Sequence, residues 1–100
     1  MEKSYIVNIV EITVCGIVGH VTQDELYTGT GNIPLFRAIA RNICLYIMHD
    51  HLGYCHRMIA ELTGLSVRSV MRNVGKARHF VFSDELYKTY WGMIKETLKL

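Results

Sequence analysis

The stretch that decides the fold is Arg57-Met-Ile-Ala-Glu-Leu-Thr-Gly-Leu-Ser-Val-Arg-Ser-Val-Met-Arg-Asn-Val74. Apolar residues recur at three- and four-residue spacings on both sides of a central Thr-Gly-Leu-Ser, a pattern typical of two amphipathic helices joined by a tight turn. Gly64 suits the turn because glycine adopts left-handed backbone angles at little cost. Ser66 is a preferred N-cap residue for the second helix. We therefore predict a helix-turn-helix over about residues 57–78, with the second helix reaching about Phe80.

The second of these helices has an apolar face and a basic face on a helical wheel. The apolar face consists of Val67, Val70, Val74, Ala77 and Val81, and the basic face consists of Arg68, Arg72, Lys76 and His79. In a helix-turn-helix, the N-terminal residues of the second helix approach the base edges in the major groove. The residues expected at that end are Ser66, Val67, Arg68, Ser69 and Arg72. The residues expected to bind phosphates, which adds affinity without sequence choice, are Arg37, Arg41, Arg57 and Lys76.

The charge distribution favours the same segment. The whole chain has a formal net charge of +2. Residues 57–80 contain five Lys and Arg residues against the single acid Glu61, a balance of +4. A clustered basic segment is the electrostatic signature expected of phosphate binding. Arg78 falls among the apolar positions of the wheel, and the pattern does not explain it.

The rest of the chain also predicts helices. Residues 4–20 are rich in Ile and Val, but their spacing favours a helix with Ile6 and Ile9 buried and Glu11 and Cys15 on the opposite, polar stripe. Thr22-Gln-Asp-Glu25 has the form of a capping box, and residues 28–34 form a loop. Residues 35–52 form the strongest predicted helix, with Leu35 among its buried residues and Gly53 ending it. Ser83 is expected to cap a last helix that buries Leu86, Tyr90, Ile94 and Leu98.

These features predict one all-α domain over residues 1–100, a small helical bundle containing the helix-turn-helix. Three cysteines, an odd number in a short chain, are interpreted as reduced thiols of a cytoplasmic protein. A membrane role is disfavoured because Glu11 interrupts the only long apolar stretch. The expected partner is double-stranded DNA, a homodimer is a further candidate state, and neither a cofactor nor a small-molecule substrate is expected.

The chain resembles the C-terminal DNA-binding domain of the bacterial replication initiator DnaA, whose fold is similar to that of the Trp repressor. The resemblance covers about residues 8–98, and Ala40-Arg-Asn-Ile-Cys-Leu-Tyr-Ile47 is its best match. Further matching segments are Val14-Cys15, Val21-Thr-Gln-Asp-Glu-Leu26, Ile59-Ala60 and Ser69-Val70. Ser66-Val-Arg-Ser69 stands where the family has Asp-His-Thr-Thr. The resemblance implies a Trp-repressor-like fold and DNA binding, linked to transcription or replication.

The sequence supports metal binding and catalysis less well than DNA binding. The potential zinc ligands His49, His51, Cys55 and His56 lack the paired spacing of a closed zinc site, so no metal is expected. No arrangement of nucleophile, base and orienting acid is evident, so no enzymatic activity is expected either. The alternative that stays open is a protein-interaction module on the same fold that no longer binds DNA. Tyr87 and Trp91 share one side of the last helix, and they either pack on the first helix or form an aromatic anchor for a partner or a second copy.

Overall fold

The computed structural model describes residues 3–29 and 31–100, and within them the chain is entirely helical, with no strand. The five α-helices are α1 (Tyr5–Val18), α2 (Leu35–Tyr46), α3 (His56–Thr63), α4 (Val67–Ser83) and α5 (Glu85–Leu98). A 3-10 turn, η1 (Gln23–Glu25), follows α1, and a π-helical turn, η2 (Ile47–His51), continues α2. The all-α prediction is therefore confirmed for the described residues.

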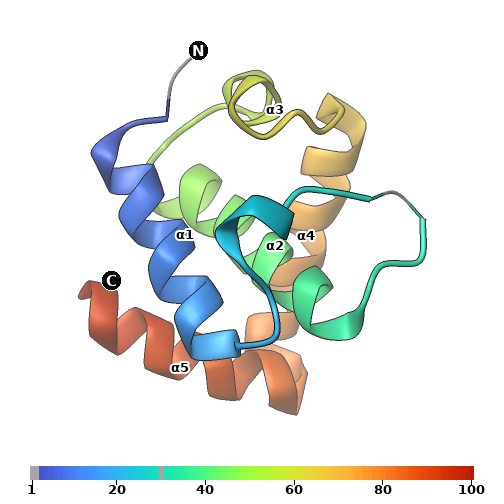
Figure 1. Cartoon of the computed structure of the whole chain (residues 1–100). Coiled ribbons are helices and arrows are strands. Elements are labelled where there is room, and N and C mark those ends of the chain that lie inside the picture. Colours follow the sequence, from blue (N-terminus) through green and yellow to red (C-terminus); the bar gives the residue numbers. More distant parts are fainter. Residues whose placement is uncertain (1–2, 30) are drawn as a thin grey trace.

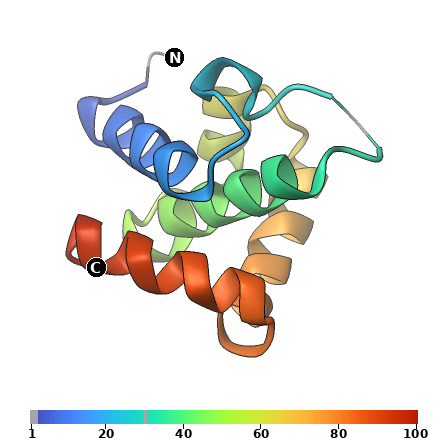
Figure 2. The ribbon, with the colours of Figure 1, turned by 60° about the horizontal axis from the view of Figure 1, so that its bottom comes forward.

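Helix α2 is the central helix of the fold. Every residue from Ile39 to Met48 is buried. Helices α1 and α4 pack against opposite sides of α2, and α5 packs against both α1 and α4 (Figures 1 and 2). The hydrophobic core lies between these layers, and its buried aromatic residues include Tyr46, Tyr87 and Trp91. Of the two alternatives for Tyr87 and Trp91, packing within the fold is therefore the one observed, and neither side chain is an exposed anchor for a partner.

The buried face of α1 matches the predicted one only in part. Val10 and Val14 are buried as expected, but Ile6 is 54% exposed, and Glu11 and Cys15 of the predicted polar stripe are buried. Because almost every position of α1 is apolar, its periodicity leaves several faces equally suitable for burial. The face that is buried is the one on which the carboxylate of Glu11 finds partners.

Glu11 has no exposed surface, and three side chains satisfy it. Its Oε1 accepts from Lys3 Nζ at 2.9 Å and from Gln23 Nε2 at 3.0 Å, and its Oε2 accepts from the Tyr27 hydroxyl at 2.5 Å. Burial raises the pKa of Tyr27 well above its usual value, so this hydroxyl keeps the proton that it donates. The network attaches α1 to the segment that contains η1.

Local capping signals are mostly correct. Thr22 and Glu25 form the predicted capping box of η1. The cap of α5, however, is Asp84, whose Oδ1 accepts from the amides of Leu86 and Tyr87 at 3.1 Å. Ser83 belongs to α4 instead and donates to the carbonyl of His79. Asp84 is the cap because α4 extends through Ser83, which makes Asp84 the residue directly before the first turn of α5.

The first and last residues of α2 also differ from the prediction. Leu35 is 60% exposed, because the first turn of α2 projects beyond the helices that cover its centre. At the other end the helix widens into η2 before Gly53, which has a positive φ of 76° as predicted for a residue that ends a helix.

The π-helical turn supplies a partner for Arg78, whose position the sequence did not explain. Asp50 accepts from Arg78 Nε at 2.8 Å and from Arg78 Nη2 at 2.6 Å, a bidentate pair that joins η2 to α4. These hydrogen bonds, with a further one from His49, lower the pKa of Asp50 to about 2.

This pair predicts a pH-dependent contribution to stability. Asp50→Asn should lower the free energy of unfolding by about 0.5–1 kcal/mol at pH 7, because the ionised carboxylate stabilises the folded chain and solvent screens the exposed pair. The pKa of Asp50 is depressed on folding. The contribution is therefore fully present above the unfolded value of about 4 and is lost as the pH falls toward 2. Urea unfolding at pH 7 and at pH 2.5 checks this, and an equal difference at both values would contradict it.

None of the helices described here is long and apolar enough to cross a membrane.

Candidate nucleic-acid interface

Helices α3 and α4 are joined by a three-residue turn. Gly64 has left-handed angles (φ 79°, ψ 2°), and its amide donates to the carbonyl of Ala60 at 2.9 Å. Ser66 caps α4, with its Oγ accepting from the amide of Ser69 at 3.1 Å and donating to the Ser69 hydroxyl. Both local predictions, the turn glycine and the serine cap, are confirmed.

Helix α4 divides into a buried face and an exposed face. Val70, Val74, Ala77 and Val81 are buried as predicted. Val67 is instead 40% exposed, because it lies in the first turn before α4 meets the core, and it therefore belongs to the exposed end. The exposed face carries a polar part, which we call the α4 surface and which consists of Arg68, Arg72, Gly75, Lys76 and His79, and beside it the exposed apolar side chains of Met71 and Phe82.

The cations of the α4 surface are not neutralised within the described part of the chain. Arg68, Arg72 and Lys76 have no carboxylate within 4.0 Å there, and neither has Arg57 on α3. The basic residues predicted on one face of this helix are therefore exposed in the folded chain and have no acidic partner among the described residues. Such a surface attracts polyanions over a range set by the salt concentration.

A polar pocket of about 350 Å³ adjoins the α4 surface. It lies where α4 meets α2 and the loop before α2. Helix α4 contributes Ser69, Arg72, Asn73 and Lys76, and α2 contributes Arg41 and Asn42. The pocket therefore places three cationic side chains from two helices around one space.

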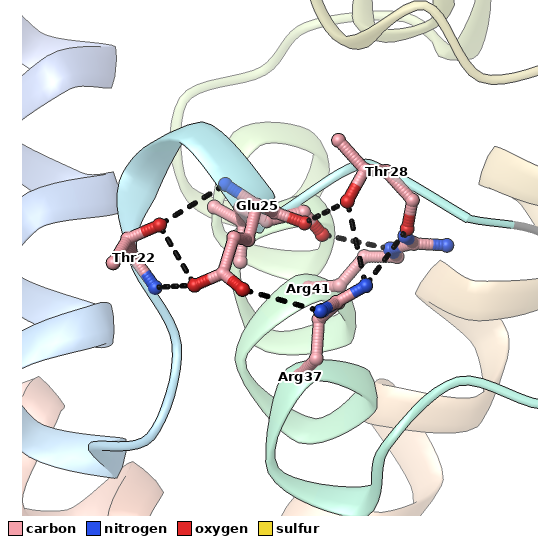
Figure 3. A network of polar contacts seen from close by, with 6 residues as sticks. Thr22, Glu25, Thr28, Arg37 and Arg41 are labelled. Atoms are coloured by element: carbon pink, nitrogen blue, oxygen red, sulfur yellow. Dashed lines mark hydrogen bonds and ion pairs between the residues drawn. The ribbon is translucent and has the colours of Figure 1, made fainter.

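Arg41 is not exposed on the flank of its helix, as the sequence predicted, but is only 5% exposed. Its Nε donates to the carbonyl of Leu26 at 2.9 Å, and its Nη2 donates to the carbonyl of Thr28 (Figure 3). Burial lowers the pKa of this guanidinium from its ordinary value. Arg41 also lines the polar pocket, and no carboxylate of the described residues pairs with it.

Arg37 lies outside this pocket. Its guanidinium turns back toward η1, with Nη2 3.4 Å from Glu25 Oε2 and Nη1 3.4 Å from Thr28 Oγ1 (Figure 3). Its Nε is buried without a hydrogen-bond partner in the described structure. Of the four residues expected to bind phosphates, Arg37 is therefore the one already engaged by an acid.

Two features of this region were missed in the sequence. Gly75 lies in the middle of α4 next to Arg68 on the wheel, and a Cβ built on it would meet nothing within 4 Å. A glycine inside a helix was a visible signal that backbone is exposed there. Asn73 and the pocket itself had no such signal, because they depend on how the loop before α2 folds against α4.

The histidines near the end of α2 do not form a metal centre. His49 and His56 stack with ring centres 4.3 Å apart, and His49 contacts Asp50, whereas His51 packs against Tyr46 and Trp91. Within residues 3–29 and 31–100, no three His, Cys, Asp or Glu side chains are arranged to hold a metal ion.

In comparisons with known proteins, the chain matches no family model, no curated protein and no solved structure. The resemblance to the initiator's DNA-binding domain therefore stays a prediction.

Proposed function

We propose that this protein is a double-stranded DNA-binding regulator without catalytic activity, acting in transcription or replication. In this proposal α3, its turn and α4 work as a helix-turn-helix, with α4 as the recognition helix. The observation that carries the proposal is the α4 surface, on which Arg68, Arg72 and Lys76 are exposed together and unpaired with acids in the described chain.

The dimensions and chemistry of α4 suit this role. Its 17 residues extend about 25 Å, and a major groove about 12 Å wide admits one helix. Arg68 and Arg72 lie within the first two turns, where side chains of a recognition helix approach base edges. An arginine binds the O6 and N7 atoms of guanine with two hydrogen bonds. Gly75 lets the helix backbone approach the DNA closely, because it has no side chain.

The polar pocket would receive a backbone phosphate. Arg41 brings a positive charge that no described carboxylate balances, and Arg72 and Lys76 flank the same space. A phosphate oxygen there would accept hydrogen bonds in a partly desolvated site, where such bonds are stronger than in water. Contacts of this kind set the register of α4 on the duplex without reading its sequence.

The test is fluorescence anisotropy of a labelled random duplex with the wild-type protein and with Gly75→Leu. About five cations at the interface predict a loss of affinity on the order of 10²–10³-fold between 50 and 200 mM salt. Gly75→Leu should weaken binding at least 10-fold, because its side chain would hold α4 away from the groove. The same variant should be more stable by about 0.8 kcal/mol, since leucine favours helices over glycine and meets no neighbour here.

Gly92→Leu on α5 is the matched control, because a Cβ there also meets nothing within 4 Å. It should bind DNA like the wild type. Absence of wild-type binding at 50 mM salt, or full binding by Gly75→Leu, would refute the proposal.

A second candidate function is protein interaction, and one observation favours it. Helix α1 exposes Tyr5, Ile6 and Ile12 to a degree unusual for large apolar side chains. Association through that surface would vary little with salt, in contrast to DNA binding.

A further inference from the structure

The exposed side of α1 carries no charged residue. We call this face the α1 surface, and it consists of Tyr5, Ile6, Ile9, Ile12 and Gly16. Tyr5 is 81% exposed, and the only charged residue in the helix, Glu11, points into the core. A helix that presents large apolar side chains to water, with its one acid turned inward, is typical of an interface that is completed by another molecule.

Gly16 gives the second, independent observation. It lies within α1, and a Cβ built on it would meet no atom within 4 Å. A helical glycine costs about 1 kcal/mol relative to alanine. Nothing in the described fold requires this glycine, because neither its backbone angles nor a close neighbour excludes a side chain. A close approach from outside the chain would require it.

The spacing of the surface residues identifies the partner. Tyr5, Ile9, Ile12 and Gly16 follow one another at steps of four, three and four, so the spacing reads the same in both directions. If two α1 helices pack antiparallel around a two-fold axis between residues 10 and 11, Tyr5 of each copy faces Gly16 of the other. Ile9 then packs beside Ile12. The large side chain of Tyr5 thus packs against Gly16, which has no side chain. The alternating steps of four and three residues are those of knobs-into-holes packing.

We propose that the α1 surface binds a second copy of this chain and forms a two-fold symmetric dimer. Such an interface is isologous, with the same patch used by both copies. The absence of charged residues on the α1 surface also favours a symmetric dimer. A two-fold axis would bring any charge on this surface close to the same charge of the other copy, and the two would repel each other.

The apolar area suits a reversible dimer. The exposed parts of Tyr5, Ile6, Ile9 and Ile12 amount to roughly 450 Å² per copy, taking about 200 Å² for a fully exposed large side chain. An apolar groove of about 270 Å³ extends the patch from Ile6 and Ile9 to Leu98 and Leu100 of the C-terminal region. Weak, transient complexes bury less than about 1,200 Å² in total, which is the class expected here.

The two proposed interfaces do not compete. Helix α1 and helix α4 lie on opposite sides of α2 (Figure 1). A dimer formed through α1 therefore leaves both α4 surfaces free to bind.

Sedimentation equilibrium of the wild-type chain tests the proposal. We expect concentration-dependent dimerisation with a Kd on the order of 10–500 µM, changing less than about 3-fold between 0.1 and 0.5 M NaCl. Gly16→Leu should weaken the dimer at least 10-fold, because the leucine fills the space that Tyr5 of the other copy occupies. The same variant should unfold at a higher temperature than the wild type, since leucine favours helix and has free space in the monomer.

Two further variants keep the test decisive. Ile12→Asp places two like charges beside the two-fold axis and should give a monomer at all concentrations. Gly75→Leu, the matched change on α4, should dimerise like the wild type. A wild-type chain that stays monomeric at about 500 µM, or a Gly16→Leu variant that dimerises normally, would overturn the proposal. A monomeric chain that sediments with phosphatidylcholine vesicles would overturn it as well, and would assign the α1 surface to a lipid.

Discussion

Replacing Arg68 and Arg72 together with alanine is expected to weaken binding to duplex DNA at least 100-fold at 50 mM salt. Each arginine contributes about 1–3 kcal/mol as a base or phosphate contact, and two such losses combine to this size. Both side chains are exposed on α4 and have no described acid as a partner, so removing them disturbs no internal ion pair. The folded state should therefore change in stability by less than about 0.5 kcal/mol. Fluorescence anisotropy gives the affinity, and thermal unfolding gives the stability.

The control must remove the same charge from a different surface. Lys88→Ala/Lys95→Ala removes two exposed cations from α5, which contributes no residue to the α4 surface or to the polar pocket. Lys88 lies 3.6 Å from Glu85, and this exposed pair contributes little to stability. If binding depends only on net charge, both double variants will lose affinity equally, and the assignment of α4 will be wrong. If α4 is the interface, the lysine variant will lose less than about 5-fold through long-range electrostatics.

Glu11→Ala should be the most destabilising single substitution named here. We expect a loss of about 2–4 kcal/mol in the free energy of unfolding, which combines the cost of an unsatisfied buried hydroxyl with the cost of a cavity. The substitution leaves the Tyr27 hydroxyl without its acceptor, removes the ion pair of Lys3, and opens a cavity between α1 and η1. Since domains of this size are stable by about 5–15 kcal/mol, a large part of the stability would be lost.

Urea unfolding followed by circular dichroism measures this loss. Glu96→Ala provides the matched control, because Glu96 is an exposed carboxylate on α5, and it should change the stability by less than about 0.5 kcal/mol. A loss below about 1 kcal/mol for Glu11→Ala would contradict the importance assigned to the network. It would also weaken the explanation of why α1 exposes its isoleucines.

Local signals predicted most of the helices and several of their ends. Gly64, Ser66, and the pair of Thr22 and Glu25 act through neighbours within four residues, so their roles are visible in the sequence. The cap at Asp84 was missed because Ser83 and Asp84 are adjacent and both are good caps. The choice between them depends on where α4 ends, which its packing against α2 and α5 decides.

The candidate site was predictable to the extent that it lies on one helix. The exposed basic face of α4 follows from a 3.6-residue period, and Gly75 was readable from the same wheel. Arg41 was not predictable, because its burial depends on the carbonyls of Leu26 and Thr28, which come from a segment about 15 residues away. The pocket has the same origin, since α2, α4 and the loop before α2 all contribute to it.

The sequence by itself determined that this protein is helical, where its main turns lie, and that α4 has one apolar and one basic face. Those properties depend on interactions between residues a few positions apart. Such interactions can be recognised in the sequence from the period of the apolar residues and from the capping residues. Only the tertiary structure decided which face of α1 is buried. Period alone cannot choose among the faces of a nearly all-apolar helix, and the choice depended on the partners that Lys3, Gln23 and Tyr27 provide for Glu11. Because these three partners satisfy the carboxylate, the face of α1 that carries Glu11 can be buried, and the face that carries Tyr5, Ile6 and Ile12 is left to the solvent.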